Sequence, residues 1–246
     1  VKDVPEKVGP LRSARPSYVK FSKFFDAIFI HWGGSHSTKN YTGGYETIKK
    51  EKVNNIDGMS GGELFSRDSS RKVSSEHRGV LNGKKINKAI KKKGYRTELK
   101  DSSFSPLHFN STVAPAGADG ATSVGVKFSD RTDTRKFTYN AEDGKYSTND
   151  WEKKVKFQNL IILKAESTYI TVPYKGSTTT YLNYKWNSGS GKYISNGTVT
   201  DITWEVADGK LVLKDAVGNT LSVNKGKSYI GFVSSNHNGK ITCSAK

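Results

Sequence analysis

The first hundred residues carry two hydrophobic patterns in alternation, one helical and one extended. After Pro16, which is favoured at the first position of a helix, aromatic side chains recur three and four residues apart. These side chains are Tyr18, Phe21 and Phe25. Residues 27–32 then form a short apolar run that two glycines end, which indicates a buried strand. We therefore expect a helix over residues 16–26 and a strand directly after it.

Two more helices are expected in this part of the chain. Residues 84–93 place three apolar side chains on one face, and Gly94 follows at a position where helices commonly end. The pattern over residues 41–50 is weaker but also helical. One strand cannot form a sheet alone, so we expect sequence before Val1 to complete this α/β lobe.

From about residue 101 the pattern changes to short β-type segments. Prolines and a run of alanine and glycine mark residues 106–122 as a linker or a long loop. Hairpin-type turn pairs recur after it, at 143–144, 196–197, 208–209, 218–219 and 238–239. The expected strands are 123–128, 135–140, 160–165, 168–172, 178–186, 198–206, 211–213 and 228–234. We expect them to pair mostly in antiparallel fashion.

The resulting fold class is α+β. An N-terminal α/β lobe is expected over residues 1–105, a linker or long loop over 106–122, and a β-rich domain over 123–246. Hydrophobic residues make up 34% of the chain and aromatic residues 11%, which argues for a folded protein rather than a disordered tail.

Charge is the strongest compositional signal. The chain has a net charge of +17, with 22 basic and 10 acidic residues in positions 1–100, against 18 and 13 in positions 101–246. A field of this sign attracts polyanions such as nucleic acid, anionic lipid headgroups or anionic envelope polymers. The alternative is a secreted protein that is simply basic.

Cysteine and hydropathy exclude several classes of protein. The single cysteine, Cys243, excludes a structural disulfide within the chain and any site that needs several thiolates. The longest apolar runs fall well short of the roughly 20 residues that a membrane-spanning helix needs.

Several motifs occur in order along most of the chain. They include Val8-Gly9-Pro10-Leu11-Arg12-Ser13-Ala14-Arg15-Pro16, Phe25-Asp26-Ala27-Ile28-Phe29-Ile30-His31-Trp32-Gly33-Gly34-Ser35, Ile56-Asp57-Gly58-Met59, Phe65-Ser66-Arg67-Asp68-Ser69-Ser70-Arg71-Lys72, Lys93-Gly94-Tyr95, Gly189-Ser190-Gly191-Lys192 and Thr203-Trp204. With these motifs the chain resembles the YerB-like family of bacterial lipoproteins, which has no established reaction.

The resemblance implies a location on the outer face of the cell membrane, with a lipid anchor at an N-terminal cysteine outside this chain. Family members usually carry further α/β sequence before the Gly-Pro-Leu-Arg-Ser-Ala-Arg segment, which is absent here. After the second arginine-rich motif, Val73-Ser74-Ser75-Glu76-His77-Arg78 replaces the usual sequence. A family histidine is therefore carried over to His77 as an expectation only.

Arg12, Ser13 and Arg15 stand directly before the first expected helix. A helix N-terminus attracts anions, and a guanidinium group is suited to phosphate or carboxylate. The segment therefore predicts a phosphate-like anion site. The alternative is that the arginines bind acidic side chains such as Asp26 or Asp68.

A second arginine segment contains Arg67, Asp68, Ser70 and Arg71. If it folds beside Arg12 and Arg15, four guanidinium groups converge and need an anion or acids such as Asp68 to offset their repulsion. The alternative is a solvated loop with local salt bridges.

His31 ends the expected strand, and Ser35 follows the two glycines. Ligands of open α/β sheets lie beyond the carboxyl ends of the strands, so both side chains are candidates to line a pocket. The alternation of residues also allows His31 to be a buried core residue.

Classical catalytic signatures are missing from the sequence, and its five histidines are scattered, so no metal site and no cofactor are expected. Basic residues form one face of the third expected helix and continue just beyond its end, at 84, 85, 88, 91, 92, 93, 96 and 100, without interleaved aromatic residues. A solvated face or attraction to a phosphate-rich surface is favoured over specific nucleic-acid binding.

The leading hypothesis is an extracytoplasmic binding protein of the cell envelope with an arginine-lined anion site. Its partner is an anionic envelope polymer, a lipid headgroup or a phosphate-bearing small molecule. One alternative is an envelope enzyme acting on a polyprenyl-phosphate-linked substrate, prompted by a similarity in arginine placement to LytR–CpsA–Psr phosphotransferases. The other is a cytosolic nucleic-acid-binding protein.

Overall fold

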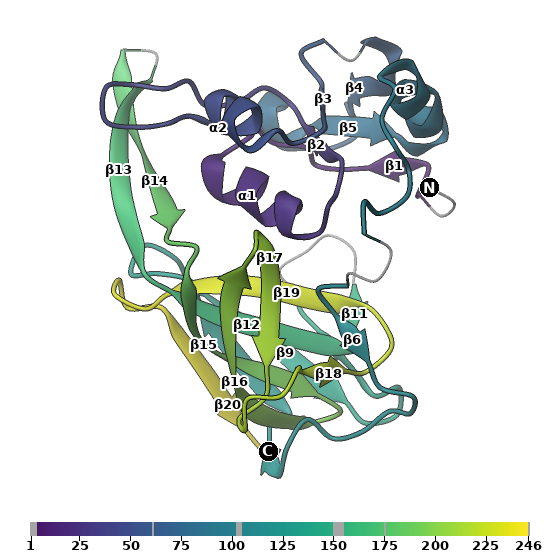
Figure 1. Ribbon diagram of the computed structural model, residues 1–246, viewed down its shortest axis with the longest axis vertical. Helices are drawn as coiled ribbons and strands as arrows, with labels where there is room; N and C mark the ends of the chain where they lie inside the picture. The colour runs from purple at the N-terminus through teal and green to yellow at the C-terminus, as the bar shows by residue number, and fades with distance from the viewer. Residues whose placement is uncertain (1–3, 61, 102–104, 150–154, 175, 246) are drawn as a thin grey trace. The chain divides into compact units, whose positions relative to one another are not determined.

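The computed structural model describes residues 4–60, 62–101, 105–149, 155–174 and 176–245. It divides into two compact units. The N-terminal unit comprises Val1–Phe104 and Thr171–Thr179, and the C-terminal unit comprises Ser105–Ile170 and Thr180–Lys246. Among the described residues, helices are few and lie in the N-terminal unit, while most strands pair in antiparallel fashion, which confirms the α+β class (Figure 1).

The three expected helices are present: α1 (Pro16–Phe24), α2 (Gly44–Glu51) and α3 (Ile86–Lys92). Proline begins α1, as its missing amide hydrogen and fixed φ favour. Helices α1 and α2 pack together through a small buried cluster. Its members are Ala14, Val19, Ile48 and Val53.

The expected strand is also present, as β2 (Phe29–His31), and it has a partner. It pairs in parallel with β3 (Asn55–Asp57), so that His31 lies opposite Asp57 at the carboxyl ends of both strands. A separate sheet has the order β1 (Lys7–Val8), β5 (Gly79–Asn82), β4 (Phe65–Arg67). The expectation of a lone strand is therefore wrong, because strands of two to four residues are too short to show a period in the sequence.

Three short 3-10 helices connect these elements: η1 (Gly62–Leu64), η2 (Ser75–His77) and η3 (Gly83–Lys85). A second apolar cluster joins β3, β4 and β5 to α3. Its buried members are Ile56, Leu64, Phe65, Leu81, Ile86 and Ile90.

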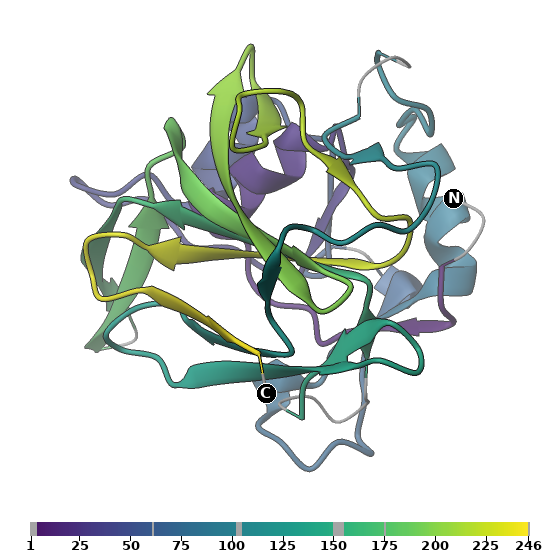
Figure 2. The same cartoon turned by 90° about the horizontal axis from the view of Figure 1, so that it is seen from below.

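The C-terminal unit contains a five-stranded and a six-stranded sheet (Figure 1 and Figure 2). The first has the order β11 (Lys156–Phe157), β10 (Lys145–Ser147), β9 (Thr134–Asn140), β8 (Ser123–Lys127), β20 (Lys240–Ser244). The second has the order β17 (Lys210–Lys214), β16 (Thr198–Ala207), β15 (Ser188–Ser195), β12 (Asn159–Ala165), β19 (Ser228–Ser234), with β7 (Asp119–Gly120) added to β16. Strands β13 (Ser167–Tyr174) and β14 (Ser177–Tyr184) form a two-stranded ribbon.

All eight strands expected after residue 122 are present, although the adjoining ends of β13 and β14 belong to the N-terminal unit, and the five-stranded sheet is antiparallel throughout. In the six-stranded sheet, β12 and β19 pair in parallel. Strands β15 and β20 were not expected from the sequence, because β15 contains two glycines and β20 lies at the polar C-terminal end of the chain.

The apolar core of this unit is built from side chains of both large sheets. Alternate residues of β8, such as Val124 and Val126, are buried as the period of a half-buried strand requires. They join Phe137 of β9 and Leu160 and Ile162 of β12 in one cluster.

Two expected turns have the backbone that a two-residue hairpin demands. Asn196 and Gly197 both have positive φ, at 50° and 75°, and so do Asp208 and Gly209, at 50° and 72°. Mirror-image turns of this kind match the twist of the strands they join, here β15 to β16 and β16 to β17.

The segment over residues 106–122, expected as a linker or a long loop, contains paired strands. Strand β6 (His108–Phe109) pairs in parallel with β18 (Ser222–Val223), and β7 pairs with β16. Ala121 at its end is fully buried. Most of this segment is therefore tied to the C-terminal unit rather than free.

The helices in the described part of the chain are all too short or too polar to cross a bilayer.

Candidate functional site

The carboxyl ends of β2 and β3 carry a buried group of polar side chains. His31 is 1% exposed, and its ring stacks on Phe29, with 5.3 Å between the ring centres. Its Nδ1 lies 2.7 Å from the carbonyl oxygen of Gly33, and its Nε2 lies 3.1 Å from Oδ1 of Asn55. Both ring nitrogens are thus within hydrogen-bonding distance of oxygen atoms.

Asp57 is the centre of this group. Its Oδ1 accepts hydrogen bonds from the backbone amides of Gly33 at 2.8 Å and Met59 at 3.0 Å, and its Oδ2 accepts the Tyr45 hydroxyl at 3.0 Å. The same Oδ1 lies 3.7 Å from Nδ1 of His31. Partial burial and the hydrogen bond to Asp57 raise the pKa of Tyr45.

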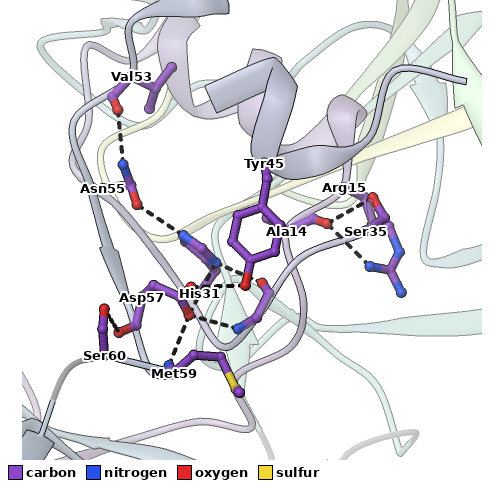
Figure 3. A network of polar contacts seen from close by, with 11 residues as sticks. Ala14, Arg15, His31, Ser35, Tyr45, Val53, Asn55, Asp57, Met59 and Ser60 are labelled. Carbon is purple, nitrogen blue, oxygen red and sulfur yellow. Dashed lines mark hydrogen bonds and ion pairs between the residues drawn. The ribbon is translucent and has the colours of Figure 1, made fainter. Parts of the chain in front are cut away.

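We call these residues the His31 network: His31, Gly33, Tyr45, Asn55, Asp57 and Met59. Figure 3 shows the side chains of His31, Tyr45 and Asp57 pointing toward one another, whereas Met59 takes part through its backbone amide. Because His31 lies near the Gly33 carbonyl and Asp57 accepts the Gly33 amide, the network joins the two strand ends to the turn at Gly33. The structure therefore supports the alternative that His31 is a satisfied core residue.

A second group of candidate residues lies in the connection between β4 and β5, residues 67–78, which we call the arginine loop. Three arginines of this loop donate to its own backbone carbonyls. Arg67 donates to Ser75, Arg71 to His77 at 2.8 Å, and Arg78 to Val73 at 2.7 Å. The Arg67 guanidinium also lies over the Trp32 ring, 4.8 Å from its centre.

Arg12 approaches the same loop from another part of the chain. Its Nη1 lies 2.7 Å from Nδ1 and 3.0 Å from Nε2 of His77, and 3.9 Å from a carboxylate oxygen of Glu76. A guanidinium has only donors, so the imidazole nitrogen that it binds must accept. The side chains of Arg12 and His77 are 46% and 48% exposed, so this pair is open to solvent.

Asp68 binds other residues than the arginines. One of its carboxylate oxygens accepts the Ser70 hydroxyl at 2.6 Å and the Ser70 amide at 3.1 Å, and the other lies 2.9 Å from the Lys7 ammonium. The hydrogen bonds from Ser70, followed by the contact with Lys7, lower the pKa of Asp68 to about 2.

This shift predicts how the loop responds to acid. Because the folded-state pKa lies below the ordinary value of 3.8, the contribution of Asp68 to stability is present above that value and is lost as the pH falls through about 2. We expect an NMR titration of the Asp68 carboxyl carbon to give a midpoint near 2. Ser70→Ala should raise the midpoint, and Ser69→Ala, at an exposed neighbour, should leave it unchanged. A wild-type midpoint at 3.8 would contradict this assignment.

The remaining candidates lie near the start of α1. Nη1 of Arg15 donates to the carbonyl of Ala14 at 3.2 Å (Figure 3). Ser35 is buried, and its hydroxyl binds the Tyr41 hydroxyl at 2.9 Å and accepts the Gly44 amide at 2.8 Å. Ser13 is partly buried beside the turn at Gly33.

The structure therefore brings together part of the expected site. Arg12, Arg67, Arg71 and His77 meet at the arginine loop, whereas Arg15 donates to the carbonyl of Ala14. The expected acidic partners have other cations: Asp26 binds Arg96, and Asp68 binds Lys7. Arg12 lies 3.9 Å from a different acid, Glu76, so the alternative that these arginines bind acidic side chains stays a prediction.

Sequence analysis assigned no role to Asp57, Tyr45 or Asn55. The sequence signal for Asp57 was its place in the motif Ile56-Asp57-Gly58-Met59, directly before a glycine at which a strand could end. Nothing in the sequence singles out Tyr45, because its contact with Asp57 joins a helix to a strand 12 residues away. Within the described ranges, no group of three or more His, Cys, Asp or Glu side chains could hold a metal ion.

Comparison with known proteins covers most of the chain. Residues 1–96 match the N-terminal domain, and residues 124–230 the C-terminal domain, of a protein family of unknown function, DUF3048. A curated protein of Bacillus subtilis strain 168, "Putative lipoprotein YerB", is 30% identical over an alignment of 242 residues that covers 94% of this chain and 68% of that protein.

A crystal structure of YerB from Bacillus subtilis has the same fold. It superposes with a TM-score of 0.73 over 98% of this chain and 79% of the other, at 24% sequence identity. The expected resemblance is confirmed by both matches. The chain belongs to the DUF3048 family of proteins of unknown function, the family with YerB-like members.

Proposed function

We propose that this protein is a lipoprotein of the bacterial cell envelope that binds an anionic, phosphate-like group at the arginine loop. The observation that carries the binding proposal is the meeting of Arg12, Arg67 and Arg71 around residues 75–77. The envelope location is supported by the Bacillus subtilis relative, which is described as a putative lipoprotein.

Charge around the loop supports an anionic ligand. Residues 67–78 contain four basic and two acidic residues, and Lys7 and Arg12 lie against them, so six cations face two carboxylates. Asp68 is already bound by Lys7 and Ser70. The excess of positive charge is partly exposed at Arg12, where an anion can replace water without a large desolvation penalty.

The loop is also held in one conformation. The bonds from arginines to the carbonyls of Val73, Ser75 and His77 fix its backbone before any ligand arrives. A site that is already ordered loses less conformational entropy on binding.

The two alternatives from the sequence receive less support. An envelope enzyme needs an acid, base or nucleophile positioned for a reaction; His31 is buried with both ring nitrogens near oxygen atoms, and the exposed His77 ring is bound by Arg12. A nucleic-acid-binding protein is expected to stack bases on aromatic side chains beside its cations, and the lysines of α3 have none interleaved in sequence.

The test is isothermal titration calorimetry of residues 1–246 with pyrophosphate and with inorganic phosphate, at fixed ionic strength. We expect Arg12→Gln to weaken binding by about tenfold or more, because one charge-assisted contact is lost. The matched control is Lys92→Gln, which removes the same charge from an exposed site on α3.

The proposal fails if neither phosphate binds, or if Arg12→Gln and Lys92→Gln weaken binding equally. Thermal unfolding of both variants checks that they remain folded, as their exposed positions predict.

A further inference from the structure

The chain has a long segment without any acidic residue. Residues 77–97 contain eight basic residues and no Asp or Glu. Six of the eight are lysines of η3, α3 and the residue after it, which we call the lysine face. They are Lys84, Lys85, Lys88, Lys91, Lys92 and Lys93.

Packing of α3 turns these lysines toward solvent. Ile86 and Ile90, four residues apart, are 6% and 2% exposed and join the apolar cluster with β3, β4 and β5. Residues three and four apart lie on the same side of a helix, and Ala89 also packs against the cluster, so the lysines occupy the opposite, exposed side. All six lysines are exposed.

Two of the six lysines have a carboxylate partner. Lys84 lies 2.9 Å from Glu6, and Lys85 lies 3.0 Å from Glu63. In each pair the hydrogen bond from the lysine lowers the pKa of the glutamate. Among the described residues, no carboxylate lies within ion-pair distance of the other four lysines, which leaves a net charge of +4 on this face.

The four lysines without a carboxylate partner repel one another. Lys88 is three residues from Lys91 and four from Lys92, the spacings at which like charges destabilise a helix. The negative end of the helix dipole offsets part of this repulsion for Lys91 and Lys92, which occupy the last turn. A surface of external negative charges would offset the rest.

We propose that the lysine face docks the N-terminal unit on the anionic phospholipid headgroups of the membrane. The inference rests on the envelope location in the proposed function, and it is independent of the arginine loop. The ammonium groups of exposed lysines on one side of a helix can pair with the many phosphates of a lipid surface. Such pairing does not require a preformed binding geometry. The arginine loop, with its ordered planar groups, suits a discrete anion instead.

The test is co-sedimentation of residues 1–246 with vesicles of mixed phosphatidylglycerol and phosphatidylcholine, and with vesicles of phosphatidylcholine alone. We expect binding to the anionic vesicles only, weakening as salt is added. Each lysine near such a surface contributes about a fivefold change in partitioning, so Lys91→Gln/Lys92→Gln together should weaken binding by about 25-fold.

The matched control is Lys225→Gln/Lys227→Gln, which removes the same net charge from two exposed positions of the C-terminal unit. A loss confined to Lys91→Gln/Lys92→Gln supports the proposal. Equal losses in both double variants would show attraction by net charge alone and overturn it. Absence of binding to anionic vesicles at low salt, or tighter binding to duplex DNA than to vesicles at the same salt, would overturn it too.

Arg12→Gln separates this inference from the anion site. We expect this variant to bind anionic vesicles as the wild type does, even where its affinity for pyrophosphate is reduced. If Arg12→Gln abolishes vesicle binding while Lys91→Gln/Lys92→Gln preserves it, the arginine loop is the lipid-binding surface and the lysine face has no such role.

Discussion

Asp57→Ala is expected to lower the free energy of unfolding of the N-terminal unit by about 3 kcal/mol. The carboxylate accepts three hydrogen bonds, from the amides of Gly33 and Met59 and from the Tyr45 hydroxyl. Alanine leaves these donors without their partner in a partly buried site, where an unmade hydrogen bond costs more than a made one contributes.

Asp57→Asn should cost less, about 1 kcal/mol, because its amide oxygen still accepts from the backbone. Urea unfolding gives the free energies, and hydrogen exchange at the Gly33 and Met59 amides shows whether the loss is local. The control is Glu46→Ala, an exposed carboxylate on α2, which should change stability by less than about 0.5 kcal/mol. If Asp57→Ala and Glu46→Ala have equal effects, the His31 network does not hold the strand ends.

Asn224→Ala is expected to destabilise the C-terminal unit by a similar amount, about 3 kcal/mol. The side chain is fully buried and uses all of its hydrogen-bonding groups. Its Oδ1 accepts from Asn110 at 3.1 Å and from the Ala114 amide at 2.9 Å. Its Nδ2 donates to the Ala114 carbonyl at 2.7 Å and to the Ser195 hydroxyl at 2.9 Å.

These bonds hold the backbone at Ala114 in place, between the pairing of β6 with β18 and the hydrogen bond from the Ala116 amide to Thr198. We expect Asn224→Ala to expose residues 106–116 to limited proteolysis as well as to lower the urea midpoint. The control is Asn187→Ala, at an exposed position in the same unit. An unchanged cleavage pattern together with an unchanged urea midpoint would show that the segment is held by other contacts.

The candidate site was predictable from the sequence only as a set of residue types. Arg12, Arg67 and Arg71 stand out as arginines among hydroxyl-bearing neighbours, and the structure brings all three to one loop. Their use of backbone carbonyls as partners was not predictable, because a carbonyl has no signature in the sequence. Arg15 lies in the same sequence segment as Arg12. Its side chain nevertheless donates to the carbonyl of the preceding residue, Ala14, at the turn before α1.

The buried polar groups show the same contrast between residues that the sequence identifies and contacts that only the folded structure reveals. His31 was recognisable as the last residue of a strand, and its alternation with apolar residues allowed for a core position. Asp57, which completes its surroundings, lies 26 residues later on a three-residue strand. Their pairing depends on the packing of α2 and the parallel register of β2 and β3, which are long-range contacts.

The sequence by itself determined the three helices, eight strands of the C-terminal unit, the hairpin turns at Asn196 and Asp208, and the family. These features depend on residues near one another in the chain, through periodic burial and the backbone preferences of proline, glycine and asparagine. The tertiary structure alone decided the parallel pairing of β12 with β19, the docking of residues 106–122 and the partners of each arginine. These features depend on contacts between segments that are far apart in the sequence. Such contacts stabilise the protein only when the whole chain is folded, so no local sequence pattern indicates them.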